Sequence, residues 1–148
     1  MKVLCKYNLG KDLRPYESKP LDKGEFGRFG ASEATEYGEL EIGKEYLVMG
    51  IVIFETYQAY LIDGNGFIST CPCQLFEIID DHISVNWKFR AINKSEEFYP
   101  FVQTIMGYPE LCSNKNAYED LIVEKDEEAE RIYFRRKIEL EKELAEQQ

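Results

Sequence analysis

Hydrophobic and polar positions alternate with a period of two in the first part of the chain, which is typical of β-strands. Lys2–Leu9 alternates loosely and predicts a half-buried strand that ends at Gly10. Glu45–Phe54 carries Val, Ile, Tyr and Phe on both faces, so we expect a central strand that is buried on both sides or bent at Gly50. Further strands are predicted at Tyr57–Ile62, Phe67–Thr70, Leu75–Ile79 and Asn86–Ile92.

The segment Asp63–Gly66 contains two overlapping tight-turn signals, Asp-Gly and Asn-Gly. Both dipeptides favour the positive φ angles that match the twist of a two-stranded hairpin. We therefore expect Tyr57–Ile62 and Phe67–Thr70 to pair as antiparallel neighbours. Four or five short strands within about 50 residues indicate a small, strongly bent antiparallel sheet or barrel.

Residues 11–43 are dense in residues that interrupt regular structure, with two prolines and five glycines. This composition predicts a long structured loop. Loops of this length inside a compact domain often serve a function. The aromatic side chains of Phe26, Phe29 and Tyr37 predict that the loop packs against the barrel.

The hydrophobic period changes after residue 92. Asn93 and Glu96 resemble a capping box, in which side chains satisfy the free N–H groups of a helix start. The apolar positions that follow at helical spacing are Phe98, Val102, Ile105 and Met106. Together they predict a short helix that ends near Gly107, with one further helical turn at Tyr108–Cys112.

A longer helix is predicted from about Ala117 to about Leu144, with Asn116 as its cap. Its apolar stripe is interrupted at Lys125–Glu128, which is the weakest part of the pattern. We expect its first half to pack on the protein and its last two turns to project into solvent.

These elements predict an α+β fold, in which a small bent antiparallel sheet or barrel is followed by a short helix and a long C-terminal helix. We expect one domain over residues 1–148, with a β-rich barrel at 1–92 and a helical part at 93–148. A chain of this length buries about two thirds of the surface of its unfolded form, so it needs no disulfide or metal to fold.

The net charge of −10 and the isoelectric point of about 4.7 disfavour binding to nucleic acids or anionic membranes. Residues 117–148 hold 11 acidic and 6 basic side chains and therefore half of this excess. The charge pattern of the terminal helix is typical of a solvated face. Only the excess on residues 1–116 is therefore expected to face a partner.

The longest apolar run, Tyr46–Phe54, is far shorter than the roughly 20 residues of a membrane-spanning helix. The N-terminus lacks the apolar stretch of a signal peptide. The expected compartment is therefore the cytoplasm, where thiols remain reduced. The four cysteines are Cys5, Cys71, Cys73 and Cys112.

The motifs that could hold a cofactor or a metal each lack a required part. Cys71 and Cys73 form one C-x-C pair without the second pair that a zinc site requires, so they are expected to be core thiols. Asp63–Ser69 has neither the third glycine of a dinucleotide loop nor the terminal Glu of a calcium loop. Gly24–Gly30 lacks the Gly-Lys-Ser/Thr of a phosphate loop. No cofactor and no metal are expected.

An enzyme remains the alternative class. A small thiol- or histidine-dependent hydrolase would use Cys73 or His82 in a pocket under the Gly-rich loop. Neighbouring aspartates could orient His82. No specific catalytic residue is assigned, because composition does not establish the required geometry.

Aromatic and acidic residues are interleaved between residues 55 and 87. Tyr side chains act as rigid anchors at interfaces, and carboxylates steer a basic partner toward them. Phe76 and Trp87 are expected in the core rather than on this surface. The predicted binding residues are Glu55, Tyr57, Tyr60, Asp63, Asp80 and Asp81.

The run Tyr46–Ile53, the hairpin at Asp63–Gly66 and the segments Leu75–Asp80 and Asn86–Phe89 resemble the small SH3-like barrels of certain bacterial proteins, including some immunity proteins of toxin systems. The resemblance covers about a third of the chain and implies a non-enzymatic binder that is encoded beside a toxic effector. The leading hypothesis is a cytoplasmic protein-binding domain with a basic protein partner. A third hypothesis is an assembly protein that oligomerises through its terminal helix.

Overall fold

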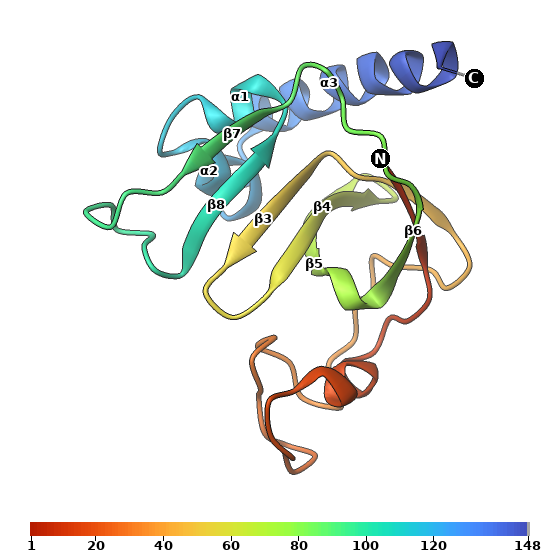
Figure 1. The fold of residues 1–148 in the computed structure, drawn as a ribbon, viewed down its shortest axis with the longest axis vertical. Helices are drawn as coiled ribbons and strands as arrows, with labels where there is room; N and C mark the ends of the chain where they lie inside the picture. Colours follow the sequence, from red (N-terminus) through yellow and green to blue (C-terminus); the bar gives the residue numbers. More distant parts are fainter. Residues whose placement is uncertain (148) are drawn as a thin grey trace.

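The computed structural model describes residues 1–147, which form two antiparallel sheets and three α-helices (Figure 1). The smaller sheet has the order β2-β1-β6, with β1 at Lys2–Cys5, β2 at Glu45–Leu47 and β6 at Phe76–Asp80. The larger sheet has the order β5-β4-β3-β8-β7. Its strands are β3 (Gly50–Phe54), β4 (Gln58–Gly64), β5 (Phe67–Pro72), β7 (Lys88–Ala91) and β8 (Val102–Gly107). The helices are α1 (Pro109–Cys112), α2 (Ala117–Ile122) and α3 (Glu127–Glu146). The α+β class is therefore confirmed.

The chain passes between the two sheets at two bends. Glu45–Phe54, predicted as one strand, is divided at Val48 and Met49, so that β2 belongs to the smaller sheet and β3 to the larger. A short 3₁₀ turn at Cys73–Leu75 separates β5 from β6 in the same way. Because the strand ladders stop at both bends, residues 1–147 form no closed barrel.

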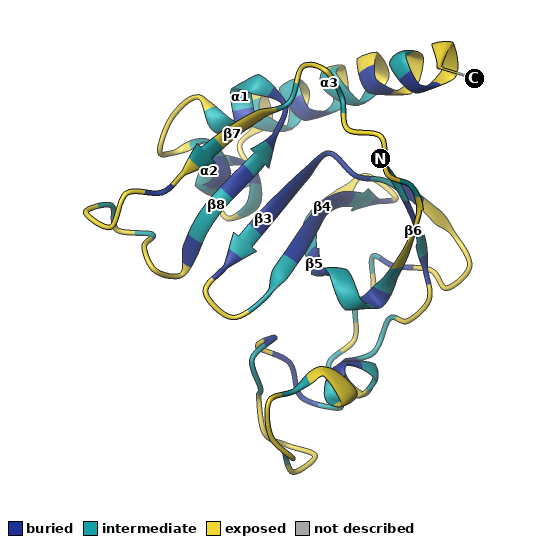
Figure 2. Ribbon diagram, viewed as in Figure 1, coloured by how far each residue is buried: buried dark blue, intermediate teal, exposed yellow. Residues whose placement is uncertain are grey.

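Both faces of the central strands β3 and β4 are buried, and neighbouring residues on each strand point to different cores. Val52 and Leu61 belong to the core under the helices, whereas Ile51 and Tyr60 belong to the core under the smaller sheet. Figure 2 shows β3 and β4 mainly in the colour of buried residues. This burial on both faces explains the continuous apolar composition of the strand sequence.

The predicted hairpin is confirmed, since β4 and β5 pair antiparallel from Ala59–Pro72 to Gly64–Phe67. Asn65 and Gly66 have positive φ angles of 51° and 85° at the turn. Asn65 and Gly66 therefore adopt the backbone conformation that the Asn-Gly signal favours, whereas Asp63 and Gly64 belong to β4 and have no positive φ angle.

The short helix predicted from Phe98 to Gly107 is wrong, because Val102–Gly107 is strand β8, between β3 and β7. Phe54 pairs with Val102 and Ile53 with Thr104, so Gln103 is an extra residue in a β-bulge. The bulge turns Val102 and Ile105 to the same core. A spacing of three residues thus arises in a strand and resembles the period of a helix.

The long terminal helix is interrupted where its apolar pattern is weakest. Lys125 lies between the last residue of α2 and the first residue of α3, and its positive φ of 53° breaks the helix there. The side chain of Asp126 caps α3 by accepting a hydrogen bond from the backbone N–H of Ala129 at 3.0 Å. The additional turn at Tyr108–Cys112 is confirmed as α1.

The loop at residues 11–43 packs on the core under the smaller sheet, which we call the smaller core. Its buried side chains there are Leu13, Phe29, Ala31 and Leu40. Phe26 is exposed, contrary to the expectation that it contacts the sheet. Within this loop the backbone N–H of Arg28 donates to the Glu17 carboxylate at 2.9 Å. Glu17 is also 3.6 Å from the Arg14 guanidinium, so these contacts link the start of the loop to its middle.

Candidate functional site

The structure separates the six residues predicted to bind a partner. Tyr60 is only 4% exposed and packs in the smaller core against the ring of Phe76 at 5.7 Å. Tyr57 is partly buried between Phe29 and Phe54, with ring centroids at 5.5 and 4.9 Å. Burial raises the pKa of Tyr57 to about 12. These tyrosines therefore stabilise the core rather than form an exposed binding surface. Phe76 and Trp87 pack against the same core, as the sequence predicts.

Asp63 lies near the end of β4, beside the hairpin turn, and holds neighbouring elements together. Its side chain is 7% exposed and lies 2.8 Å from the ammonium of Lys137. The hydroxyl of Tyr133 donates a second hydrogen bond at 3.0 Å. Asp63 thus joins the turn between β4 and β5 to α3, and its charge is already neutralised.

Glu55, Asp80 and Asp81 are the predicted residues that contact solvent. Glu55 follows β3 in the larger sheet, whereas Asp80 ends β6 in the smaller sheet and Asp81 follows it. The two aspartates are therefore the part of the predicted set that stays together on an accessible surface.

These aspartates adjoin an open strand edge. β6 pairs with β1 on one side, and no strand of residues 1–147 pairs with its other side. Val3 pairs with Ile78 and Lys2 with Asp80, so Ile79 is the extra residue of a bulge. Figure 2 shows β6 in the colours of exposed and intermediate residues, in contrast to β3 and β4.

Apolar side chains are concentrated along this edge and the turn that follows. Ile78 and Ile79 are 49% and 43% exposed, and Ile83 and Val85 are more exposed still. We call Glu77–Asp81 with Ile83 and Val85 the β6 surface. The strand was predicted from its composition, but its position at an edge depends on the pairing of β1, which comes from the other end of the sequence.

Hydrogen bonds order the end of the β6 surface. The backbone N–H of His82 donates to Asp80 at 3.0 Å, and His82 Nδ1 lies 2.7 Å from the same oxygen. The hydrogen bonds from His82 hold the pKa of Asp80 below its usual range, so the carboxylate stays ionised. The hydroxyl of Ser84 and the N–H of Val85 donate to Glu143 at 2.7 and 3.1 Å, which ties the turn to α3.

Asp80, Asp81 and His82 also offer three ligand atoms within 4.8 Å of one another. Within the described residues, they are the one group of this kind close enough to share a metal ion. All three are consecutive residues of an exposed or half-exposed turn. Because exposed acidic groups of this kind also occur as a solvated turn, we assign no metal site.

The thiols do not have the environment of catalytic cysteines. Burial raises the pKa of Cys71 far above its ordinary value and also raises the pKa of Cys73. The Sγ of Cys71 is 3.2 Å from the Glu39 carboxylate, whose charge disfavours a thiolate further. A nucleophilic thiol requires the opposite shift of its pKa.

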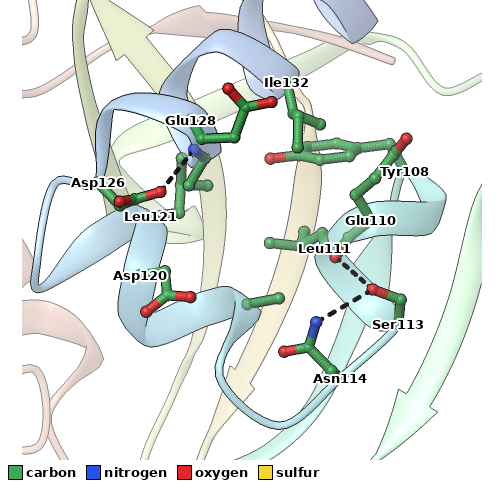
Figure 3. A pocket seen from close by; sticks show the side chains of 12 residues that line it. Tyr108, Glu110, Leu111, Ser113, Asn114, Asp120, Leu121, Asp126, Glu128 and Ile132 are labelled. Atoms are coloured by element: carbon green, nitrogen blue, oxygen red, sulfur yellow. Dashed lines mark hydrogen bonds between the residues drawn. The ribbon is translucent and has the colours of Figure 1, made fainter.

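A cavity of about 250 Å³ lies between α1, α2 and the start of α3 (Figure 3). Its apolar wall is formed by Tyr108, Leu111, Leu121 and Ile132, together with Ala117 and Ala129. Its polar rim is formed by Glu110, Ser113, Asn114, Asp120, Asp126 and Glu128. We call this space the interhelical cavity. The amino-acid sequence did not predict this cavity, because its walls come from three helices whose relative positions depend on tertiary packing.

Ion pairs fix the walls of the interhelical cavity. Arg136 on α3 donates two hydrogen bonds to the Glu110 carboxylate on α1, at 2.8 and 2.9 Å. Arg135 adds a third contact at 3.2 Å. The hydrogen bonds from Arg136 hold the pKa of Glu110 below its usual range. The cavity is therefore a preformed space rather than a gap between mobile helices.

No helix among residues 1–147 is both long enough and apolar enough to cross a membrane. Comparison of the chain with protein families, curated proteins and solved structures gave no match. The β6 surface and the interhelical cavity are therefore the features from which a function can be inferred.

Proposed function

We propose that the protein is a non-enzymatic protein-binding domain that receives an extended, basic segment of a partner along the open edge of β6. The observation that carries this proposal is the coincidence of an unpaired strand edge, exposed isoleucines and flanking carboxylates. The proposal retains the basic partner expected from the sequence, but it replaces the tyrosine anchors with Ile78 and Ile79.

Strand addition explains how such an edge binds. The free side of β6 offers backbone donors and acceptors to a further strand, while side-chain contacts supply specificity. Ile78 and Ile79 offer apolar contact area, and Glu77, Asp80 and Asp81 attract Lys or Arg side chains. Glu77 forms an ion pair with Lys6 at 3.8 Å. Both side chains are about half exposed, so this pair competes only weakly with a basic side chain of the partner.

Bulges and charges also protect edge strands from unwanted pairing. Glu77, Asp80 and the bulge at Ile79 fit that protective role equally well. The four large apolar side chains exposed within residues 78–85 do not fit a protective role, because an edge strand is protected from pairing by polar or charged side chains. Selective binding of a basic strand distinguishes the two roles.

The test uses a short synthetic peptide in which Lys and Val alternate, with an alternating Glu and Val peptide as its control. We expect the basic peptide to slow hydrogen exchange of the β6 amides and to bind more weakly as salt increases, because exposed charges are screened over about 8 Å at physiological ionic strength. Equal binding of the acidic peptide, protection elsewhere on the protein, or no binding at low salt would each reject the proposal.

Two substitutions separate the contributions of apolar contact and charge. Ile79→Ser, which changes no charge, is expected to weaken the basic peptide about tenfold, whereas Ile138→Ser, at a similarly exposed position on α3, should leave affinity unchanged. Asp81→Asn should reduce the salt dependence, whereas Glu41→Gln, an exposed position on the long loop, should not.

An immunity-type inhibitor is the narrower form of this proposal, in which the basic segment belongs to a toxin. The resemblance to SH3-like barrels supports it only by analogy. Survival of cells that express the product of a neighbouring gene, with and without this protein, tests that narrower form independently of the peptide experiment.

A further inference from the structure

The interhelical cavity is independent of the β6 surface, since the two share no lining residue. Its volume of about 250 Å³ exceeds that of a single water molecule several times over. Apolar side chains line its interior and carboxylates stand around its rim, with Asp120, Asp126 and Glu128 on one side and Glu110 on the other, as Figure 3 shows. Cavities with this division select ligands that have one apolar part and one charged part.

Tyr108 places an unused polar group in this cavity. The residue is only 5% exposed, and its ring packs edge-on against Tyr133 at 6.2 Å. In Figure 3 its hydroxyl points into the cavity, toward the side of Leu121 and Ile132. No side chain or backbone group of residues 1–147 forms a hydrogen bond with this hydroxyl. The hydroxyl itself is accessible from the cavity, so it is free to form a hydrogen bond with a ligand group at this position.

The carboxylates at the rim differ in how far their charge is already compensated. Glu110 binds Arg135 and Arg136, and Glu128 binds Arg131 at 2.6 Å. Asp126 accepts only the backbone hydrogen bond that caps α3. The side chain of Asp120 has no hydrogen bond or ion pair with any described residue. Asp120 and Asp126 therefore leave negative charge at the cavity that no cation of residues 1–147 neutralises.

We propose that the interhelical cavity binds a small organic amine with a polar group at its far end. Its ammonium is placed at Asp120 and Asp126, and its apolar body lies on Leu111, Leu121 and Ile132. Its far polar group forms a hydrogen bond with the hydroxyl of Tyr108. An ammonium gains a charge-assisted hydrogen bond from the carboxylates, which a neutral ligand of the same shape does not.

The probes are three ligands that differ in one group each. Tyramine has both the ammonium and a far hydroxyl, 2-phenylethylamine lacks the hydroxyl, and 4-ethylphenol lacks the ammonium. Titrations are followed by NMR shifts of the α1 and α2 amides. We expect tyramine to bind with a Kd of about 1 mM or tighter, as its number of atoms allows, and the other two to bind more weakly.

Variants assign the two ends of the ligand. Asp120→Asn is expected to weaken tyramine about tenfold, whereas Glu124→Gln, an exposed carboxylate at the end of α2 that does not line the cavity, should not. Tyr108→Phe retains the ring and should weaken tyramine while leaving 2-phenylethylamine unchanged. Thermal unfolding of each variant confirms that it is folded.

Several outcomes would overturn the proposal. These are the absence of saturable shifts with tyramine at ten times the expected Kd, equal affinity for 4-ethylphenol, or no effect of Asp120→Asn in a folded variant. A lysine side chain of a protein is another source of an ammonium. Tighter binding of Nα-acetyl-lysine amide, whose ε-ammonium is free, than of tyramine would assign the cavity to a lysine side chain and reject a small organic amine as its ligand.

Discussion

Asp63 and Lys137 form an ion pair across 74 positions of sequence, with the ammonium 2.8 Å from the carboxylate. Tyr133, one helical turn before Lys137 on α3, donates to the same carboxylate at 3.0 Å. The three groups fasten α3 to the turn of the hairpin. A residue that the sequence placed at a binding surface is thus part of the framework that positions the helices.

Asp63→Asn is expected to reduce the free energy of unfolding by about 2–4 kcal/mol, because Lys137 loses its counter-charge in a partly buried site. Urea unfolding at neutral pH measures the change. Glu127→Gln, at the exposed start of α3, is the control and should change stability by less than about 0.5 kcal/mol. Equal stability of Asp63→Asn and the wild type would show that the ion pair is not structural.

Glu110→Gln is expected to lower stability by about 1 kcal/mol at neutral pH, since it removes the ion pairs with Arg135 and Arg136. The pKa of Glu110 is lowered in the folded protein, so its contribution is complete above the ordinary carboxylate value of 4.5 and is lost as the pH falls through the folded value. The stability difference between wild type and variant should therefore shrink below pH 4.5. Urea unfolding over a pH series checks this, and a constant difference would contradict it.

Gly50→Ala is expected to destabilise the protein by about 2–3 kcal/mol, because a β-carbon at this position would lie 2.8 Å from the Met106 carbonyl oxygen and 2.9 Å from the Leu111 side chain. Gly38→Ala is the matched control. A β-carbon there has no neighbour within 4 Å, and the backbone φ angle is not positive. The two melting temperatures should differ by several degrees, and identical values would show that β3 and β8 can separate without cost.

The cysteines are expected to react slowly with an alkylating probe in the folded protein at pH 7–8 and rapidly after unfolding. Burial raises the pKa of every thiol, most strongly that of Cys71. Mass spectrometry of the alkylated protein identifies the modified residues. Rapid modification of Cys73 in the folded protein at pH 7 would favour the hydrolase alternative over a binding domain.

Local chemistry made the hairpin predictable, because the turn residues and the strands they join lie within about 15 positions of one another. The same holds for the end of α2, where the interrupted apolar pattern coincides with the break at Lys125. β8 could not be predicted from its own residues, since the bulge at Gln103 turns Val102 and Ile105 to one face. A helix and a bulged strand then have the same apolar spacing.

The candidate site depended more strongly on distant parts of the chain. The acidic character near Asp80 and Asp81 was visible in the sequence, and both residues remain accessible. The burial of Tyr60 follows from its position on β4, whose register with β3 and β5 decides which face each side chain occupies. β6 has an open edge because only β1 pairs with it, on one side.

The sequence by itself determined the α+β class, the hairpin, most strand positions and the acidic net charge, because each of these depends on composition or on neighbouring residues. Tertiary structure alone decided the bends between the sheets, the burial of Tyr60 and Asp63, the edge position of β6 and the interhelical cavity. These features depend on contacts between residues far apart in sequence, such as Asp63 and Lys137, and such contacts leave no periodic pattern in either segment.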